Sequence, residues 1–242
     1  RLAWSWAALA MIAFGLVVTL TPDTRLALVV DDVGTTAAAA LAAFTGLWYS
    51  RIGTGPEADP ATARTRRGWR FVGLACASWA AGNAVWAFYE LGLDQGAPFP
   101  SLADVGYLGF VPLALIGIIL LGPSFASVGT FKRSMDVALV TVGLGGAGWI
   151  LVLAPVAAST EGALEQALAL AYPIGDLLML AVTLSVITLT RGRDRTLTIL
   201  PIGLILFALA DVSFAYMTAT DQYTSGDLSA WAWFTGFLLM AL

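Results

Sequence analysis

A few acidic, amide and aromatic side chains lie within the long apolar stretches of this chain, at positions that could place them around one site. Trp79, Asn83, Trp86 and Glu90 follow one another at spacings of four, three and four residues, which puts them on one face of a helix. Asp211 lies well inside another apolar stretch. Ionisable groups in apolar surroundings are costly unless partnered, and they are candidate functional residues. The candidate ligand-binding residues are Asn83, Trp86, Glu90, Asp104, Tyr107, Tyr172, Asp176 and Asp211.

The acids of this set have no predicted basic partner, because Arg25 is the only basic residue expected on their side of the protein. Protonation, a bound cation or a water-filled cavity would each relieve them. Tyrosine hydroxyls close by in the sequence could donate hydrogen bonds to them. A small ligand, a lipid or a cation is therefore the expected occupant, and the sequence identifies neither a metal nor a cofactor. A polar network that only ties helices together is the structural alternative.

Some of these acids have a second interpretation as helix caps. Asp32, Asp104 and Asp176 recur at 72-residue intervals, and each opens an expected helix, as does Asp227. This pattern indicates repeated helical hairpins. An acid in a first turn interacts well with the free N–H groups there, and Ser101-Leu-Ala-Asp104 has capping-box spacing. Asp176 could instead lie deeper, because the stretch before it is also apolar.

The elements that position these residues are predicted to be membrane-spanning helices. The chain is 59% hydrophobic and 12% charged, about half the charged fraction of an ordinary soluble domain. A spanning helix needs roughly 20 mainly apolar residues, and about eight such runs occur. We expect an all-α polytopic bundle with helices at Trp4–Leu20, Val33–Tyr49, Trp69–Leu91, Ser101–Leu121, Ser134–Ala154, Tyr172–Thr190, Leu197–Ala219 and Leu228–Leu242.

Basic residues predict the orientation of the bundle. All but Arg25 fall before the first run or in every second gap between runs, and short loops rich in Lys and Arg stay in the cytoplasm. Both termini are therefore expected to be cytoplasmic, in a multi-pass protein of the bacterial inner membrane. The segment Ser50–Gly68, with its Gly, Pro and Arg residues, is expected to be a flexible cytoplasmic loop. It could contact anionic headgroups of membrane lipid.

Several chemistries are excluded by missing residue types. The chain has no His, which excludes His-ligated haem, copper and zinc. The only lysine, Lys132, belongs at a cytoplasmic helix end, so a mid-membrane retinal Schiff base is excluded. Cys76 is the only cysteine and cannot form an internal disulfide. No Gly-rich phosphate loop follows a strand, and nothing indicates a nucleic-acid partner.

Four segments in order resemble a known family. They are Ala77-Ser-Trp-Ala-Ala-Gly-Asn-Ala-Val-Trp-Ala-Phe-Tyr-Glu90, Pro98-Phe-Pro-Ser-Leu-Ala-Asp-Val-Gly-Tyr-Leu-Gly-Phe110, Ala171-Tyr-Pro-Ile-Gly-Asp-Leu-Leu-Met-Leu180 and Leu209-Ala-Asp-Val-Ser-Phe-Ala-Tyr216. Together they resemble the multi-helix membrane sensor domain at the N-terminus of many actinobacterial cyclic-di-GMP signalling proteins. The resemblance implies a sensory input domain, a GGDEF or EAL output domain in cis on the cytoplasmic side, and a homodimer.

Residues 1–242 are accordingly expected to be one integral-membrane domain, cut from a longer protein before its output domain. No GGDEF or EAL motif occurs in them, so cyclase or phosphodiesterase chemistry is expected only outside this chain, and no catalytic residue is assigned. Two alternatives stay open. Gly175-Asp176 and Ala210-Asp211 resemble the paired aspartates of eight-helix lysoplasmalogenase-type hydrolases, in which two carboxylates act as acid and base. The repeated aspartates also suit a small transporter.

Overall fold

A computed structural model describes residues 2–21, 24–52, 59–122, 162–190, 196–220, 222 and 228–242, together with single residues between 142 and 157. Within these residues the fold is all-α, as predicted, and contains no strand. The helices are α1 (Leu2–Leu20), α2 (Arg25–Tyr49), α3 (Pro60–Ala87), the short π-helix η1 (Phe88–Gly92), α4 (Leu102–Leu121), α7 (Ala163–Thr190), α8 (Thr196–Ala219) and α9 (Leu228–Ala241).

Membrane-spanning character follows from the length and composition of these helices. Five segments are long and apolar enough to cross a bilayer, namely Arg25–Tyr49, Pro60–Gly92, Leu102–Leu121, Ala163–Ile187 and Thr198–Thr218. Trp4–Leu20 and Ser229–Ala241 are apolar but shorter. The predicted helix Ser134–Ala154 lies almost wholly outside the described residues, as does Asp227. The total of eight helices therefore stays a prediction.

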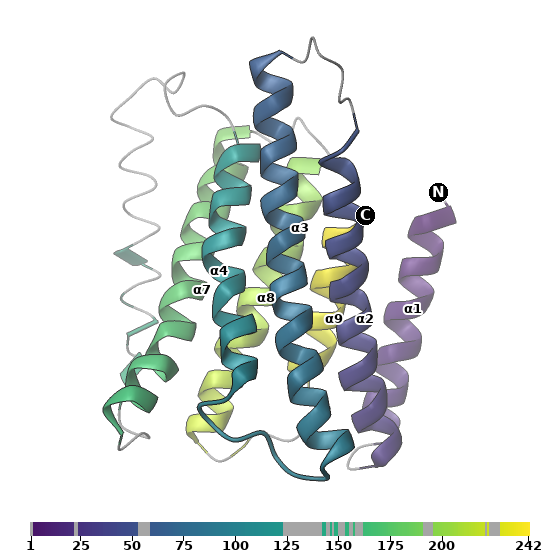
Figure 1. Cartoon of the computed structure of the whole chain (residues 1–242), viewed down its shortest axis with the longest axis vertical. Coiled ribbons are helices and arrows are strands. Elements are labelled where there is room, and N and C mark those ends of the chain that lie inside the picture. The colour runs from purple at the N-terminus through teal and green to yellow at the C-terminus, as the bar shows by residue number, and fades with distance from the viewer. Residues whose placement is uncertain are drawn as a thin grey trace.

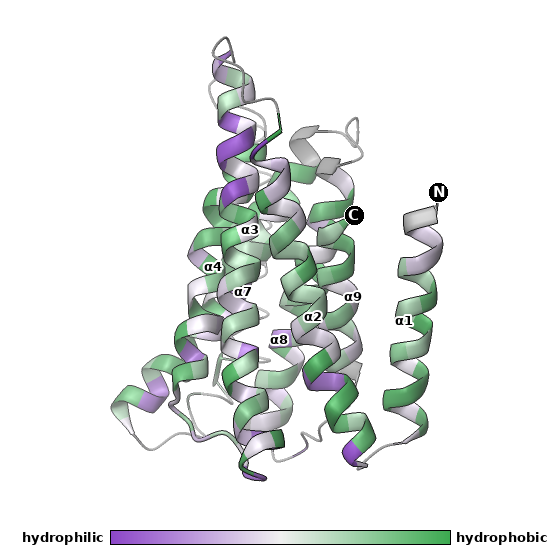
Figure 2. Cartoon of the chain, turned by 45° about the vertical axis from the view of Figure 1, so that its right-hand side comes forward, coloured by the Kyte–Doolittle hydropathy of each residue, from purple (hydrophilic) through white to green (hydrophobic). Residues whose placement is uncertain are grey.

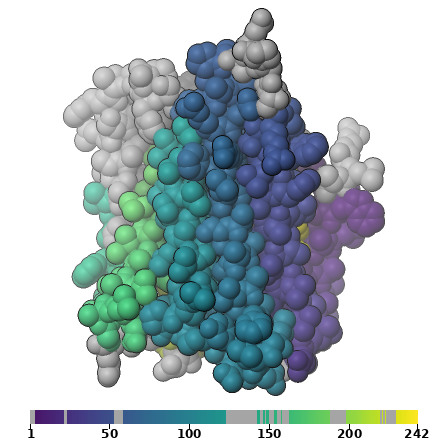
Figure 3. All heavy atoms as spheres, viewed as in Figure 1, coloured from purple at the N-terminus to yellow at the C-terminus, as the bar shows by residue number. Residues whose placement is uncertain are grey.

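The helices form an up-and-down bundle in which α3 packs between α2 and α4, α8 packs between α7 and α9, and α9 also contacts α2. Helix α1 lies at the edge, beside α2 and α9 (Figures 1 and 2). The space-filling view shows α2, α3 and α4 as one continuous face (Figure 3). Both termini lie toward the end at which α2 connects to α3, which we call the basic end (Figure 1). The α3–α4 connection marks the opposite end, which we call the acidic end.

Close approach of small residues sets the spacing between α3 and α4. A Cβ built on Gly106 would lie 2.5 Å from the backbone of Gly82, and one built on Gly82 would lie 2.7 Å from the Ala103 carbonyl oxygen. Ser78 uses this proximity to donate a 2.8 Å hydrogen bond to the Gly106 carbonyl. Small residues that let backbones approach are typical of membrane helix pairs. This contact places Asn83 and Tyr107, each next to one of the two glycines, side by side.

Helices α2, α3 and α7 begin eight or nine residues earlier than predicted from the sequence. Helix α2 begins at Arg25, with Thr24 as its N-cap, instead of at Val33. Helix α7 begins at Ala163 instead of Tyr172. These shifts show that a first-turn capping role is wrong for Asp32 and Asp176, since both lie well inside their helices. The same role is confirmed for Asp104, which forms the capping box with Ser101.

The flexible loop predicted for Ser50–Gly68 is wrong over its second half. Helix α3 begins at Pro60 instead of Trp69, and the Asp59 side chain caps it by accepting a hydrogen bond from the Thr62 N–H. The exposed first turns of α3 are hydrophilic, as Figure 2 shows. Arg64 spans from these turns to the C-terminus of α4, where it donates 2.6 Å hydrogen bonds to the carbonyls of Gly122 and Ile119. Free carbonyls at a helix end bind a guanidinium well.

Candidate functional site

Asn83 is the centre of a buried polar contact among α2, α3 and α4. Its amide nitrogen donates to the Asp32 carbonyl at 3.1 Å and to the Thr36 hydroxyl at 2.9 Å. Its amide oxygen accepts a 2.9 Å hydrogen bond from the Tyr107 hydroxyl. The Asn83 side chain is therefore satisfied by three groups from two neighbouring helices. It is also held rigidly, because each of those helices fixes one end of the amide.

Asp32 and Glu90 form a pair of carboxyls beside this contact. Asp32 is only 5% exposed, and its side chain interacts with that of Glu90. Glu90 lies on the π-helical segment that ends α3, and it also interacts with the Trp86 side chain. One Asp32 oxygen, Oδ2, is buried without a hydrogen-bond partner. π-helical turns are frequent at functional sites, and here the turn carries one of the paired acids.

A tyrosine hydroxyl links α7 to the first turn of α4. The Tyr172 hydroxyl donates a short hydrogen bond to Asp104 Oδ1. The other oxygen of the same carboxylate, Oδ2, accepts from the Ser101 backbone N–H at 2.6 Å. Asp104 therefore has both of the roles that the sequence left open, as a cap of α4 and as a member of the polar cluster. Tyr172 is also close enough to Asp211 and Tyr107 to interact electrostatically with both.

Asp176 and Asp211 are a second pair of carboxyls, on α7 and α8, and they lie close enough to interact electrostatically. Asp211 Oδ1 accepts a hydrogen bond from the Trp233 indole N–H of α9, with 2.5 Å between the two atoms. Asp176 is only 1% exposed, and neither of its carboxyl oxygens has a hydrogen-bond partner among the described residues. A buried carboxyl without a partner is a costly arrangement. Asp176 is therefore the member of the cluster that most needs a further group.

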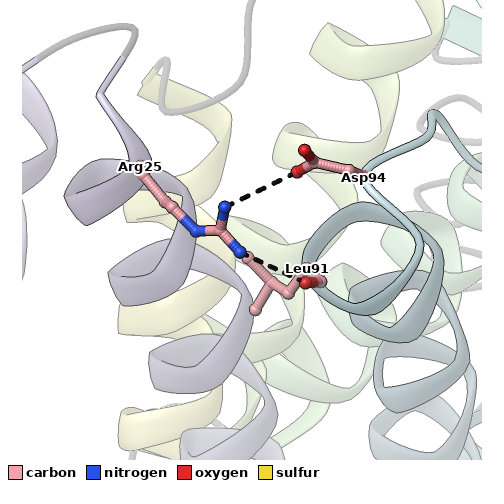
Figure 4. A network of polar contacts seen from close by, with 3 residues as sticks. All are labelled: Arg25, Leu91 and Asp94. Carbon is pink, nitrogen blue, oxygen red and sulfur yellow. Dashed lines mark hydrogen bonds and ion pairs between the residues drawn. The ribbon is translucent and has the colours of Figure 1, made fainter.

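No described basic side chain neutralises these acids. Arg25 was the basic residue expected at the acidic end of the bundle. Its side chain points to the surface instead (Figure 4). Its guanidinium lies 3.8 Å from the Asp94 carboxylate, with the two side chains 71% and 82% exposed. It also donates a weak 3.5 Å hydrogen bond to the Leu91 carbonyl. An exposed pair of this kind contributes little to stability, and it leaves the buried acids without a described counter-charge.

The donor set favours some ligands over others. Among the described residues no group of three or more His, Cys, Asp or Glu side chains has the geometry to hold a metal ion. The acids occur in pairs instead, and aromatic rings surround them. Trp86 contacts Phe214, and Phe214 contacts Trp233. Paired carboxylates and ring faces both attract monovalent and organic cations.

Comparison with known proteins leaves the chain without an assigned family. No family model, no curated protein and no solved structure matches it. The resemblance to membrane sensor domains therefore stays an expectation.

All eight predicted site residues lie in the part of the chain that the structure describes, in the half of the bundle nearer the acidic end. Side-chain interactions link them into two groups. In one group, Asn83 contacts Tyr107 and the backbone carbonyl of Asp32. Glu90 belongs to the same group, because it interacts with Trp86 and with the Asp32 side chain. The other group joins Asp104, Tyr172, Asp176 and Asp211. Whether they bind a ligand stays a prediction.

Asp32 and Trp233 contact predicted site residues but were not among them. Asp32 was interpreted as a cap, because the polar start of α2 at Thr24 and Arg25 was not assigned to the helix. The N-cap threonine was the available signal. Trp233 lies in a run of apolar residues, and nothing in its neighbours distinguishes it from a lipid-facing tryptophan.

Proposed function

We propose that this chain is a membrane-embedded sensory input domain that binds a small cation between α7 and α8. The observation that supports this proposal is the Asp176 carboxyl, which is buried beside the Asp211 carboxyl and has no hydrogen-bond partner in the described part of the chain. A bound cation would supply the missing counter-charge without a basic side chain. The lack of a three-acid cluster among the described residues favours a monovalent or organic cation over a divalent metal held by three carboxylates.

The link between Asp211 and Trp233 gives such binding a route to the last helix. Helix α9 runs from the acidic end toward the basic end (Figure 1), so a change at Asp211 would act on the start of the helix that leads there. In the proposed orientation the basic end is cytoplasmic, because Arg51, Arg66 and Arg67 belong to it. We propose that cation occupancy shifts α9 between two positions. The output would be a cyclic-di-GMP domain that follows in the same chain, as the sequence resemblance implies.

A binding experiment on the purified domain tests the first part of this proposal. Thermal unfolding in detergent would be followed with sodium, potassium or choline chloride at constant ionic strength. A cation that binds only the folded state stabilises by about 2.7 kcal/mol at 100 times its dissociation constant. We expect one of these cations to raise the unfolding temperature of the natural protein and to have no such effect on Asp176→Asn. Asp94→Asn, an exposed acid at the same end, is the matched control. Equal responses of the natural protein and Asp176→Asn would contradict the cation site.

The signalling part is tested in the full-length protein. Coupling free energies between sites are typically 1–3 kcal/mol, which corresponds to roughly five- to 150-fold. We expect Asp176→Asn and Asp211→Asn each to change the cellular cyclic-di-GMP concentration by a factor within that range. Asp94→Asn should leave the concentration unchanged. Unchanged output in both site variants would remove the sensory role even if the cation binds.

The same carboxyl pair also supports a second candidate, the lysoplasmalogenase-type hydrolase. Two interacting carboxyls in different surroundings can divide acid and base roles. Here Asp211 accepts a hydrogen bond from Trp233, whereas Asp176 has no hydrogen-bond partner. Cleavage of a lysoplasmalogen by the purified chain, lost in Asp176→Asn and in Asp211→Asn, would favour the hydrolase over the sensor.

A further inference from the structure

A hollow at the basic end has no part in the proposed cation site. Its volume is about 280 Å³, close to the lower limit of ligand pockets, and residues of α1, α2, α3, α8 and α9 line it. Its apolar walls are formed by Ile199, Leu200, Leu239, Met240 and Leu242, and its aromatic lining by Trp4, Tyr49 and Trp69. Five helices thus converge on a cavity with aliphatic walls, beside the edge helix α1.

The aromatic lining is typical of a membrane–water interface. The rings of Tyr49 and Trp69 lie 5.4 Å apart and are tilted by 37°, so they form one wall across the α2–α3 contact. Trp4 reaches the same hollow from α1. Tryptophan and tyrosine are enriched at headgroup level, where one side of the ring is apolar and the other is hydrated. An aromatic lining of this kind is expected where an acyl chain meets its headgroup.

Arg66 does not line the hollow, but it is fixed next to a residue that does. Its Nε donates a 3.0 Å hydrogen bond to the Ser50 carbonyl, next to Tyr49. Arg66 precedes Trp69 by three residues, so both lie on the same side of α3. The terminal Nη1 and Nη2 groups make no hydrogen bond to any described residue. A guanidinium held by Nε with its terminal N–H groups free is well suited to bind a phosphate oxygen.

The described charges around the hollow are mainly positive. Arg51 and Arg70 are exposed and flank Tyr49 and Trp69 in the sequence. The described acid of this region is Asp59, whose Oδ1 accepts the capping hydrogen bond of α3, and the basic side chains outnumber it. Basic pockets between membrane helices bind the headgroups of anionic lipids, and each Lys or Arg near an anionic membrane surface contributes about 1 kcal/mol.

We propose that this hollow is a binding site for an anionic phospholipid. Part of an acyl chain lies between Leu200, Leu239 and Trp4, and the phosphate binds Arg66, with Arg70 adding charge at the rim. The proposal does not depend on the cation site. It requires only that the basic end lies at one face of a bilayer.

Native mass spectrometry of the detergent-purified chain tests this site, with phosphatidylglycerol and phosphatidylcholine of identical acyl chains as probes. We expect phosphatidylglycerol to bind more tightly, and Arg66→Gln to reduce its binding about fivefold, the factor that corresponds to one arginine contact. Arg67→Gln is the matched control, since Arg67 is exposed on the same helical turn. Leu239→Phe, which narrows the hollow, is expected to weaken phosphatidylglycerol binding while Arg66 is retained.

Three results would overturn the proposal: equal binding of the two lipids, equal loss in Arg66→Gln and Arg67→Gln, or unchanged binding in Leu239→Phe. Unfolding temperatures measured on the same samples show whether each variant is folded. If Arg66→Gln does not fold, Arg66→Lys replaces it. Lysine retains the charge but lacks the fork of N–H donors, so the proposal then requires weaker phosphatidylglycerol binding in the lysine variant than in the natural protein.

Discussion

Trp233 of α9 donates its indole N–H to Asp211 of α8 across 2.5 Å. The same ring packs against Trp79, with centroids 6.4 Å apart, and against Phe214 at 5.7 Å. Trp233 is thus fixed on its apolar faces by two aromatic neighbours, while its single polar atom binds a carboxylate. Through this hydrogen bond, the position of α9 depends on whether the Asp211 carboxylate is available as an acceptor.

Replacing Trp233 by Phe tests this tie. The variant keeps an aromatic ring but loses the N–H donor, so Asp211 loses its described partner. Side-chain hydrogen bonds between membrane helices contribute about 0.6 kcal/mol on average and up to about 1.7. We expect Trp233→Phe to destabilise the domain by about 0.5–2 kcal/mol, measured by unfolding in mixed detergent. Trp6→Phe is the control, because Trp6 is 66% exposed on α1. Equal stability of the two variants would show that the indole N–H is not needed.

Gly106→Ala tests the α3–α4 contact that holds Asn83 and Tyr107 together. The new methyl group would meet the Gly82 backbone at 2.5 Å, and backbone cannot yield as a flexible side chain can. Overpacking of this kind typically costs about 1–3 kcal/mol. We expect a lower unfolding temperature for Gly106→Ala than for Gly96→Ala, since a Cβ on Gly96 has nothing within 4 Å. If both variants melt together, the glycine contact does not set the helix spacing.

The helices were predictable from the sequence, but the starts of α2, α3 and α7 were not. Apolar runs located α4 and α8 to within a residue or two at each end. The start of α3 was predicted nine residues too late because its first turns are rich in arginine. A prediction from apolar runs includes only the apolar part of a helix and misses polar turns that extend beyond it. The Asp59-Pro60 pair was the missed signal, since Asp is a good N-cap and Pro suits the first helical position.

Part of the candidate site was predictable from the sequence. Positions along each helix placed Asp176 and Asp211 in the same half of the bundle, and the two were expected to lie within reach of one another, as they do in the structure. The sequence contains no information on how the helices are rotated about their axes, so the hydrogen-bond partners of these acids could not be derived. The role of Trp233 could not be predicted for the same reason. Its partner lies on another helix, and its own sequence neighbours are uniformly apolar.

The N-cap of α3 predicts a pH dependence outside the membrane. Hydrogen bonds from Thr62 lower the pKa of Asp59, so the folded value lies below the unfolded value of about 3.9. The stabilisation from the charged cap is complete above the unfolded pKa and is lost as the pH falls through the folded pKa. We expect the Thr62 amide resonance to titrate below about pH 3.9. Asp59→Asn should keep the cap without this titration, and a Thr62 shift that is independent of pH in the natural protein would contradict the prediction.

Cysteine labelling tests the proposed orientation of the bundle. The basic residues of the α2–α3 region lie at one end, and Gln95 and Gln222 are exposed at the other. Because short basic loops stay in the cytoplasm, we expect an impermeant maleimide to label Gln95→Cys and Gln222→Cys on intact cells. Ala61→Cys, in the exposed first turn of α3, should react only after the membrane is opened. Cys76 is buried between two alanines, so Cys76→Ala provides a background without other thiols.

Labelling of Ala61→Cys on intact cells, together with protection of the other two positions, would reverse the orientation. It would place the cation site on the cytoplasmic side and the lipid site in the outer leaflet.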